Sequence, residues 1–217
     1  MRNFFLWELL FPTKCIFCLK ITSDHRAQIC PQCREALTDA VTYHKKIPFS
    51  SGWTALWSYD GAVRNSLLRY KFRRKRHYCR IYGEELAALL LNKQISFDLI
   101  TWVPISTRRK LKRGYDQCEL LSRVLENRTG IPAVRCLRKT KHTPPQSTLQ
   151  GEAQRKANVL GVYQPVRPSV FAGKTVLLLD DIITTGATIS ECAKTLMLAG
   201  AKEVYCAAIA SAAKNHK

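Results

Sequence analysis

Short, mostly apolar runs, among them 176–179, which is apolar throughout, alternate along the chain with stretches in which apolar residues recur at helical spacing. The runs lie at 98–103, 133–137, 176–179 and 204–209, and residues 53–59 follow the alternation of a strand. Helical patterns lie at 84–91, 117–127 and 189–198. A continuous apolar run is typical of a strand buried on both faces, as in a parallel sheet covered by helices. The pattern therefore predicts an α/β domain with a doubly wound, mostly parallel sheet.

The run at 176–179 leads directly into Asp180-Asp181 and then into the loop Thr184-Thr185-Gly186-Ala187-Thr188. Carboxylates at the carboxyl end of a parallel strand lie in the crevice where such sheets bind ligands. The loop offers backbone N–H groups and three hydroxyls in front of a helix, an arrangement that binds anions. The sequence Thr188-Ile189-Ser190-Glu191 fits a capping box and predicts that the helix begins there.

Two acids beside an anion-binding loop suit a sugar phosphate. The carboxylates can accept hydrogen bonds from vicinal ribose hydroxyls while the loop holds a 5′-phosphate. The stretch 176–188 resembles the phosphoribosyl diphosphate (PRPP) motif of type I phosphoribosyltransferases. The alternative is a surface Asp-Asp turn that closes an ordinary strand. A Walker A loop is excluded, because its first glycine would fall at Pro168, ahead of Gly173-Lys174-Thr175.

Two Cys-x2-Cys pairs, Cys15/Cys18 and Cys30/Cys33, lie near the N-terminus with eleven residues between them. They can bring four thiolates within reach of one tetrahedral ion, and an all-thiolate set selects zinc. We expect a zinc ribbon or knuckle whose folding energy comes from the metal. The alternatives are four free cysteines or a redox pair. The predicted division is a zinc-binding module and linker at 1–45 and a phosphoribosyltransferase-like domain at 46–217.

The chain has 217 residues and 46% of them are hydrophobic, enough for one full core and a small appendage. It carries 35 Lys and Arg against 16 Asp and Glu, a formal net charge of +19. This charge attracts nucleic acid, an anionic membrane or phosphorylated small molecules, or it serves solubility alone. Nine cysteines, an odd number, favour a reducing cytoplasm over a disulfide scaffold. No stretch approaches the about 18 uninterrupted apolar residues of a membrane span.

The first of two basic runs, at 61–82, interleaves Arg and Lys with aromatic residues. This composition suits single-stranded nucleic acid, because phosphates meet the charges and bases stack on the rings. We take Lys71, Phe72, Arg73 and Arg74 as candidate nucleic-acid contacts. The alternative is a solvated helix face with long Arg stems.

The second basic run follows the apolar run at 98–103 and the residues Pro104-Ile105-Ser106. It contains Arg108, Arg109 and Arg113. Cations directly after a strand end could bind the diphosphate of PRPP or, with Arg113, a nucleic-acid backbone.

A polar stretch at 139–158 lacks apolar periodicity and contains Gln146, Arg155 and Asn158. Polar loops of this length inside a compact domain are usually functional or disordered. We interpret it as a flap that could cover a ligand, with a surface excursion as the alternative.

The order of these elements resembles the ComF family of late-competence proteins, in particular its ComFC-type members. The resemblance covers about Phe11 to Ala210. It rests on the cysteine pairs, Lys71-Phe72, Val103-Pro104, residues 113–117, residues 145–158 and the motif at 176–188. One departure concerns Tyr115 and Asp116, which stand where the family usually has Phe and Asn. An acid at 116 puts a phosphate contact by that residue in doubt.

The resemblance implies a phosphoribosyltransferase-like domain that handles incoming single-stranded DNA during natural transformation. It also implies a cytoplasmic location and other competence or DNA-processing proteins as partners, through which the chain could associate with the inner face of the membrane. Asp180 and Asp181 would hold the ribose hydroxyls with the help of Mg²⁺. The loop 184–188 would hold the 5′-phosphate, and the loop from Pro104 to Arg109 would face the diphosphate.

Two functions follow from this sequence. The first is a DNA-handling protein that binds PRPP as a regulator or a vestigial substrate. The second is an active phosphoribosyltransferase with an unknown acceptor, in which carboxylates and Mg²⁺ stabilise the charges that develop as diphosphate leaves ribose C1. A transcriptional regulator that senses PRPP is a third class, for which no helix-turn-helix pattern is found.

Overall fold

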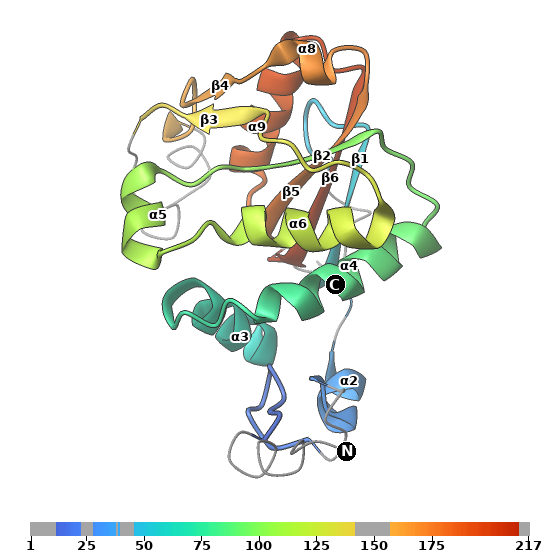
Figure 1. Ribbon diagram of the computed structural model, residues 1–217, viewed down its shortest axis with the longest axis vertical. Coiled ribbons are helices and arrows are strands. Elements are labelled where there is room, and N and C mark those ends of the chain that lie inside the picture. The colour runs from blue at the N-terminus through green and yellow to red at the C-terminus, as the bar shows by residue number, and fades with distance from the viewer. Residues whose placement is uncertain (1–11, 23–27, 38, 40–45, 142–156, 213–217) are drawn as a thin grey trace, which may run out of the picture.

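A computed structural model describes residues 12–22, 28–37, 39, 46–141 and 157–212 (Figure 1). Of the predicted flap, Gln146 and Arg155 lie outside these residues. Asn158 lies within them, in a turn that precedes the strand at 163–165. None of the helices in the described ranges has both the length and the apolar character needed to cross a lipid bilayer.

The centre of the fold is a sheet of four strands in the order β1-β6-β5-β2. The strands are β1 (Gly52–Ser58), β6 (Glu203–Ser211), β5 (Thr175–Ile183) and β2 (Leu99–Trp102). All three neighbouring pairs are parallel, as the continuous apolar runs predicted. The five central residues of β1 are all buried, so this strand is covered on both faces rather than on one.

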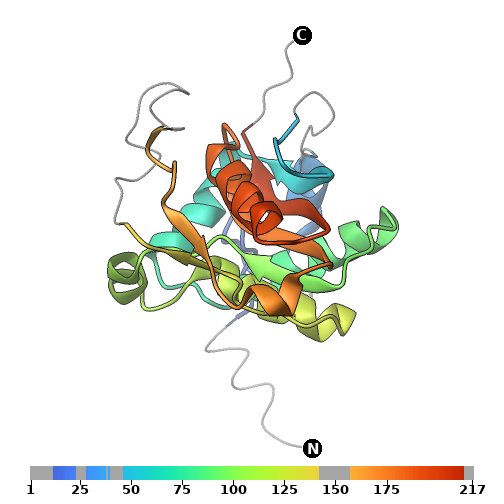
Figure 2. The same ribbon diagram turned by 90° about the horizontal axis from the view of Figure 1, so that it is seen from above.

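Helices cover both faces of this sheet (Figures 1 and 2). Alternate residues of β5 divide between two hydrophobic clusters, with Leu177 and Leu179 in one and Val176 and Leu178 in the other. The first cluster contains buried residues of α3 (Gly61–Phe72), α4 (Tyr78–Asn92) and α6 (Gln117–Thr129). The second contains those of α9 (Ala187–Leu198), α8 (Pro168–Phe171) and the antiparallel hairpin of β3 (Leu137–Lys139) and β4 (Tyr163–Pro165). The doubly wound architecture is therefore confirmed.

The expected strand at 133–137 is only partly present. Ala133 makes an isolated parallel bridge with Ile100, and the regular strand β3 begins at Leu137. The chain leaves the edge of the main sheet after this bridge and pairs with β4 instead. The hairpin formed in this way lies beside α9, in the second hydrophobic cluster.

Helices α4 and α6 pack closely because Gly83 lacks a side chain. A Cβ atom at Gly83 would lie 2.5 Å from a methyl carbon of Val124 on α6. Real Cβ atoms do not approach other heavy atoms this closely, so a larger residue would push the two helices apart.

The N-terminal cysteine segment packs against α3. The carbonyl oxygen of Ile16 accepts hydrogen bonds from Ser66 Oγ and from the Arg69 guanidinium, both at 2.7 Å. The same guanidinium donates to the Phe17 carbonyl at 2.8 Å. The Phe17 ring meets Trp57 of β1 edge-on, with 5.4 Å between centroids. The cysteine segment is thus attached to the α/β domain by hydrogen bonds and by apolar contacts.

The predicted start of the last helix is wrong. Helix α9 begins at Ala187, and its N-cap is Gly186 in the left-handed region, with φ at +80°. Thr188 is therefore already helical and does not cap the helix. Glu191, the expected partner in the capping box, instead accepts a hydrogen bond from the backbone N–H of Gly161 at 2.9 Å. The predicted end is confirmed, since α9 stops at Leu198 just before Gly200, whose φ is +100°.

Candidate functional site

The two acids lie in the last four residues of β5, the strand between β6 and β2. The strand continues through both acids to Ile183, four residues beyond the end of the apolar run at Leu179. Strand β2 ends at Trp102, opposite Leu179, so the acids extend beyond the end of this neighbour. They therefore lie at the carboxyl end of the parallel sheet, where such folds bind ligands.

The carboxylates of Asp180 and Asp181 lie close together and close to Cys118 of α6. One oxygen of each carboxylate and the Cys118 sulfur all lie within 4.8 Å of one another. The backbone N–H of Asp181 donates to Asp180 Oδ1 at 2.8 Å. Burial raises the pKa of Asp180, and the charge of Asp181 raises it further, while Lys71 lowers it. Adjacent half-buried carboxylates of this kind attract a cation.

Lys71 supplies such a cation. Its Nζ lies 2.9 Å from Asp181 Oδ1, and the two side chains are 16% and 14% exposed. Lys71 is the penultimate residue of α3, so this helix reaches the end of β5. The sequence suggested that Lys71 contacts nucleic acid, whereas the structure places it in the acid site.

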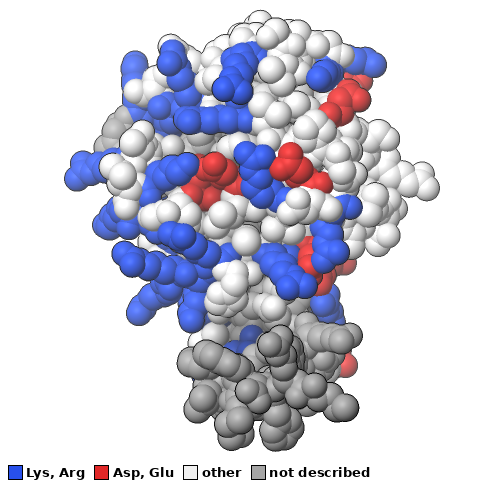
Figure 3. Space-filling model, viewed as in Figure 1, with Lys and Arg blue, Asp and Glu red and all other residues white. Residues whose placement is uncertain are grey.

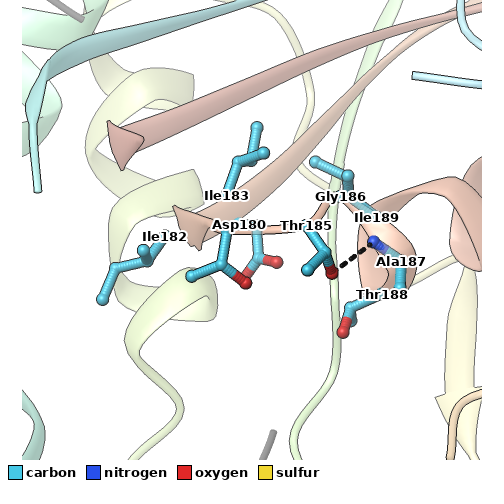
Figure 4. A pocket seen from close by; sticks show the side chains of 9 residues that line it. Asp180, Ile182, Ile183, Thr185, Gly186, Ala187, Thr188 and Ile189 are labelled. Atoms are coloured by element: carbon cyan, nitrogen blue, oxygen red, sulfur yellow. Dashed lines mark hydrogen bonds between the residues drawn. The ribbon is translucent and has the colours of Figure 1, made fainter. Parts of the chain in front are cut away.

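The loop that follows β5 forms a small pocket with Asp180 (Figure 4). Residues 182–189 supply the rest of its lining. Gly186 at φ +80° allows the sharp turn into α9, a conformation that other residues rarely adopt. Thr185 Oγ1 accepts a hydrogen bond from the Ala187 N–H at 3.4 Å. Because the first amides of a helix have no helical acceptors, they can bind an anion in this pocket.

The side chains around the loop are oxygen-rich. Figure 4 shows the hydroxyl groups of Thr185 and Thr188 on the same side of the turn, with the carboxylate of Asp180 on the adjoining strand. The predicted motif residues therefore lie together, with Asp180 and the helix start in one pocket and Asp181 next to Asp180.

The loop from Pro104 to Arg109 follows β2, the strand next to β5. Pro104 is buried, Arg108 is exposed and Arg109 is half-buried. The two arginines lie in α5 (Thr107–Arg113). Burial lowers the pKa of Arg109, and repulsion from Arg113 lowers it further. The structure thus places a cationic helix after the strand adjacent to the acids.

Asp116, the acid whose contact with a phosphate the sequence put in doubt, has a structural role. Its Oδ1 accepts hydrogen bonds from the N–H groups of Cys118 and Glu119, at 3.0 and 3.3 Å, and caps α6. Its Oδ2 accepts from the Ile105 N–H at 3.2 Å, which fixes the loop after β2. The residue is 4% exposed. The carboxylate of Asp116 therefore holds the loop after β2 against the start of α6.

Lys139 is a candidate binding residue that the sequence did not single out. It ends β3, and its Nζ lies 5.5 Å from the centroid of the Tyr163 ring on β4. Burial, and to a smaller extent the charge of Arg109, lower the pKa of Lys139 to about 8, against the opposite effect of Asp180. Asp180 and Arg109 are thus both electrostatic neighbours of Lys139. Its place after the apolar run at 133–137 was the available signal.

The two basic runs come together on one surface. The Arg76 guanidinium donates to the Gly114 carbonyl at 2.9 Å and lies 5.0 Å from the centroid of the Tyr115 ring. The Arg113 guanidinium lies 5.0 Å from the centroid of the Phe72 ring. We call this surface the basic face and define it by Arg73, Arg74, Lys75, Arg76, Arg108, Lys110, Lys112 and Arg113. In Figure 3, Lys and Arg gather on the left, over α3, α5 and β3.

The aromatic residues of the first basic run are mostly not available for stacking. Tyr70 and Tyr78 are 0% and 3% exposed and belong to the core beneath α3 and α4. Phe72, in contrast, is 61% exposed, and Leu111 of the second run is 80% exposed. In this run the basic face therefore offers the exposed phenyl ring of Phe72 and the exposed imidazole of His77 rather than a series of tyrosines.

The four N-terminal cysteines form a cluster. Their sulfur atoms all lie within 4.8 Å of one another. The N–H groups of Phe17 and Cys30 donate to Cys15 Sγ at 3.4 and 3.5 Å. Four sulfurs at such distances fit a tetrahedral zinc ion, whose ligand sulfurs lie about 2.3 Å from the metal. The predicted grouping is confirmed and fits a zinc ribbon.

A comparison with protein families agrees with this architecture. Residues 111–217 match the phosphoribosyl transferase domain. These residues include the acids, the loop 184–188 and the strands β5 and β6. Together with the parallel sheet, this match defines the chain as a protein with a type I phosphoribosyltransferase-like fold.

Curated relatives narrow the assignment. The chain is 35% identical to competence protein F of Haemophilus influenzae over 104 residues, which are 47% of the chain and 45% of that protein. It is 31% identical to competence protein ComFC of Streptococcus pneumoniae over 153 residues, 69% of the chain and 64% of that protein. The chain is thus similar to competence proteins of the ComF family, and it carries a phosphoribosyltransferase-like domain.

The matched regions span about half to two thirds of these two relatives. Among solved structures, glutamine PRPP amidotransferase from B. subtilis, complexed with ADP and GMP, is 22% identical, with a TM-score of 0.44. The similarity covers 65% of this chain and 30% of that one.

Proposed function

We propose that the chain binds PRPP together with Mg²⁺ at the end of β5. The observation that carries this proposal is that Asp180 and the helix-start loop line one pocket, with the Asp181 carboxylate beside Asp180. Carboxylate oxygens suit Mg²⁺, and the Lys71 ammonium already stands as a cation beside Asp181. The donor set therefore fits this metal. When bound, Mg²⁺ would offset negative charge on the diphosphate.

Each part of the ligand would have its own residues. Asp180 and Asp181 would accept hydrogen bonds from the ribose hydroxyls and hold Mg²⁺. The amides and hydroxyls of residues 184–188 would bind the 5′-phosphate. Arg108 and Arg109 would face the diphosphate, with Lys139 on the opposite hairpin.

The test is a calorimetric titration of the zinc-loaded protein with PRPP and Mg²⁺. Asp181→Asn should weaken binding at least about tenfold, because it removes one anionic ligand of the cation. Glu203→Gln is a matched control, since Glu203 is an exposed acid at the opposite end of the sheet. Equal affinity of Asp181→Asn and wild type would refute the proposal.

We further propose a role in DNA uptake, in which the basic face binds single-stranded DNA. Support comes from the names of the two curated relatives and from the convergence of two basic runs on one surface. Phosphates would meet the arginines and lysines, and Phe72 could stack on a base.

We also propose that the cysteine cluster holds zinc and that residues 1–45 form a module distinct from 46–217. We further propose that the chain acts in the cytoplasm with other DNA-processing proteins.

DNA binding can be tested with a labelled oligonucleotide and fluorescence anisotropy. Affinity should fall steeply between 50 and 200 mM salt, because binding releases counterions from DNA, by a factor of about 300 for about six phosphate contacts to a single strand. The double variant Arg73→Gln/Arg74→Gln should bind more weakly with a shallower salt slope. Lys174→Gln/Lys202→Gln removes two exposed charges from the far end of the sheet and should bind like wild type. A salt-independent isotherm would contradict DNA binding by this face.

The acid pair also favours a second candidate function, transfer of ribose 5-phosphate to an acceptor. Carboxylates beside the ribose would stabilise positive charge that develops at C1 as diphosphate leaves. Diphosphate release, measured in the presence of Mg²⁺ and candidate nucleobases, distinguishes this function from simple binding. It should be abolished in Asp181→Asn.

A further inference from the structure

Lys71 is held by a backbone that is fixed on two sides. The preceding residue, Tyr70, donates its hydroxyl to the Gln117 carbonyl at 2.8 Å, and its own carbonyl accepts a hydrogen bond from the Tyr115 hydroxyl. Arg69 binds the cysteine segment. The last turn of α3 therefore has little freedom, and only the flexible stem of Lys71 can move the ammonium.

The ammonium lies where a divalent cation would bind. Oxygens of Asp180 and Asp181 lie together with Cys118 Sγ within a span of 4.8 Å. Lys71 Nζ lies 2.9 Å from Asp181 Oδ1 and is largely shielded from water. It neutralises one carboxylate, and a second cation at the same oxygens would be repelled by it.

We propose that Lys71 is a built-in counter-ion that keeps free Mg²⁺ off the acid pair and makes the metal and a phosphorylated ligand bind together. Phosphate groups in the pocket would draw the ammonium away from Asp181 and free that carboxylate for the cation. Lys71 is thus a positioning residue that determines which form of the ligand is accepted. This inference rests on the proposed function, because it assigns the order of binding at the same site.

The test uses Mn²⁺ as a probe, with free Mn²⁺ measured by electron paramagnetic resonance on zinc-loaded protein. Without PRPP, Lys71→Met and Lys71→Gln should bind Mn²⁺ at least tenfold more tightly than wild type. Lys93→Met, which removes an exposed lysine at the end of α4, should match wild type. The double variant Lys71→Met/Asp181→Asn should bind Mn²⁺ no more tightly than wild type. This loss would show that the ion binds at the acid pair.

Measuring Mn²⁺ affinity again in the presence of PRPP distinguishes this inference from the proposed function. PRPP should tighten Mn²⁺ binding to wild type strongly and to Lys71→Met much less, because the variant has no counter-ion to displace. If Mn²⁺ binds the folded Lys71 variants no better than wild type, the counter-ion inference is wrong. If the Lys71 variants bind Mn²⁺ more tightly but PRPP does not change Mn²⁺ affinity in any of the proteins, the role of Lys71 as counter-ion is supported and PRPP binding is refuted.

Discussion

The cysteine segment and the acid pair both contact helix α3, and their two groups of metal-ligand atoms are built differently. The four sulfurs come from one short segment, two of the cysteines are buried, and backbone amides point at Cys15 Sγ. The acids come from a strand end, where Asp180 lines a pocket and Asp181 pairs with Lys71. A closed set of four identical donors suits a structural metal, whereas an open, partly neutralised pair suits exchangeable ligands. We therefore propose that the cysteine cluster stabilises the fold and that the acid pair binds a ligand.

The largest effect should come from removing one cysteine of the four-sulfur cluster. Cys30→Ser removes a ligand that is 6% exposed, and the segment that it holds has little core of its own. Because metal binding supplies the folding energy of such a module, we expect a loss of about 3–5 kcal/mol of unfolding free energy and release of zinc. Thermal unfolding and a colorimetric zinc assay measure both. Cys79→Ser, outside the cluster, should retain its zinc, and an unchanged melting temperature in Cys30→Ser would contradict a structural metal.

A smaller effect should distinguish structural from functional acids. Asp116→Ala leaves the amides of Ile105, Cys118 and Glu119 without their acceptor. Loss of a helix cap and of a buried acceptor should cost about 2–3 kcal/mol. Asp116→Asn retains one acceptor oxygen and should cost less. Urea unfolding measures the difference, and equal stability of Asp116→Ala and wild type would show that this acid does not support the loop.

The smallest effect concerns pH. With burial lowering the pKa of Lys139 to about 8, the side chain is charged below that pH and neutral above it. A bound anion favours the charged form, so PRPP affinity should be nearly flat below pH 7 and fall up to about tenfold per unit above pH 8. Lys139→Met should lose this dependence. Calorimetry between pH 7 and 9 tests it, and an identical pH profile in wild type and variant would exclude Lys139 from binding.

The sequence predicts features that are contiguous. The apolar run, the acids and the loop 184–188 are neighbours along the chain, and the cysteine pairs have a recognisable spacing. Backbone geometry alone places such residues together, so their grouping could be predicted. The capping box was misleading because Gly186 in the left-handed region starts α9 before Thr188 can act.

Pairs from separate elements could not be predicted in this way. Lys71 and Asp181 are more than one hundred residues apart, and their contact depends on how α3 packs beside β5. The contacts of Arg76 with Gly114 and of Lys139 with Tyr163 likewise arise from packing between elements. Sequence patterns indicate local periodicity and burial, whereas predicting these contacts requires knowing how whole helices and strands are placed relative to one another.

The central claim is that the acids at the end of β5 and the following loop bind PRPP with Mg²⁺. Hydrogen exchange of the zinc-loaded protein, followed by mass spectrometry with and without PRPP and Mg²⁺, tests it most directly. The account predicts slower exchange in peptides that cover residues 180–190, and no such change in Asp181→Asn. If PRPP leaves exchange in these peptides unchanged, or slows it only elsewhere in the chain, the account is contradicted.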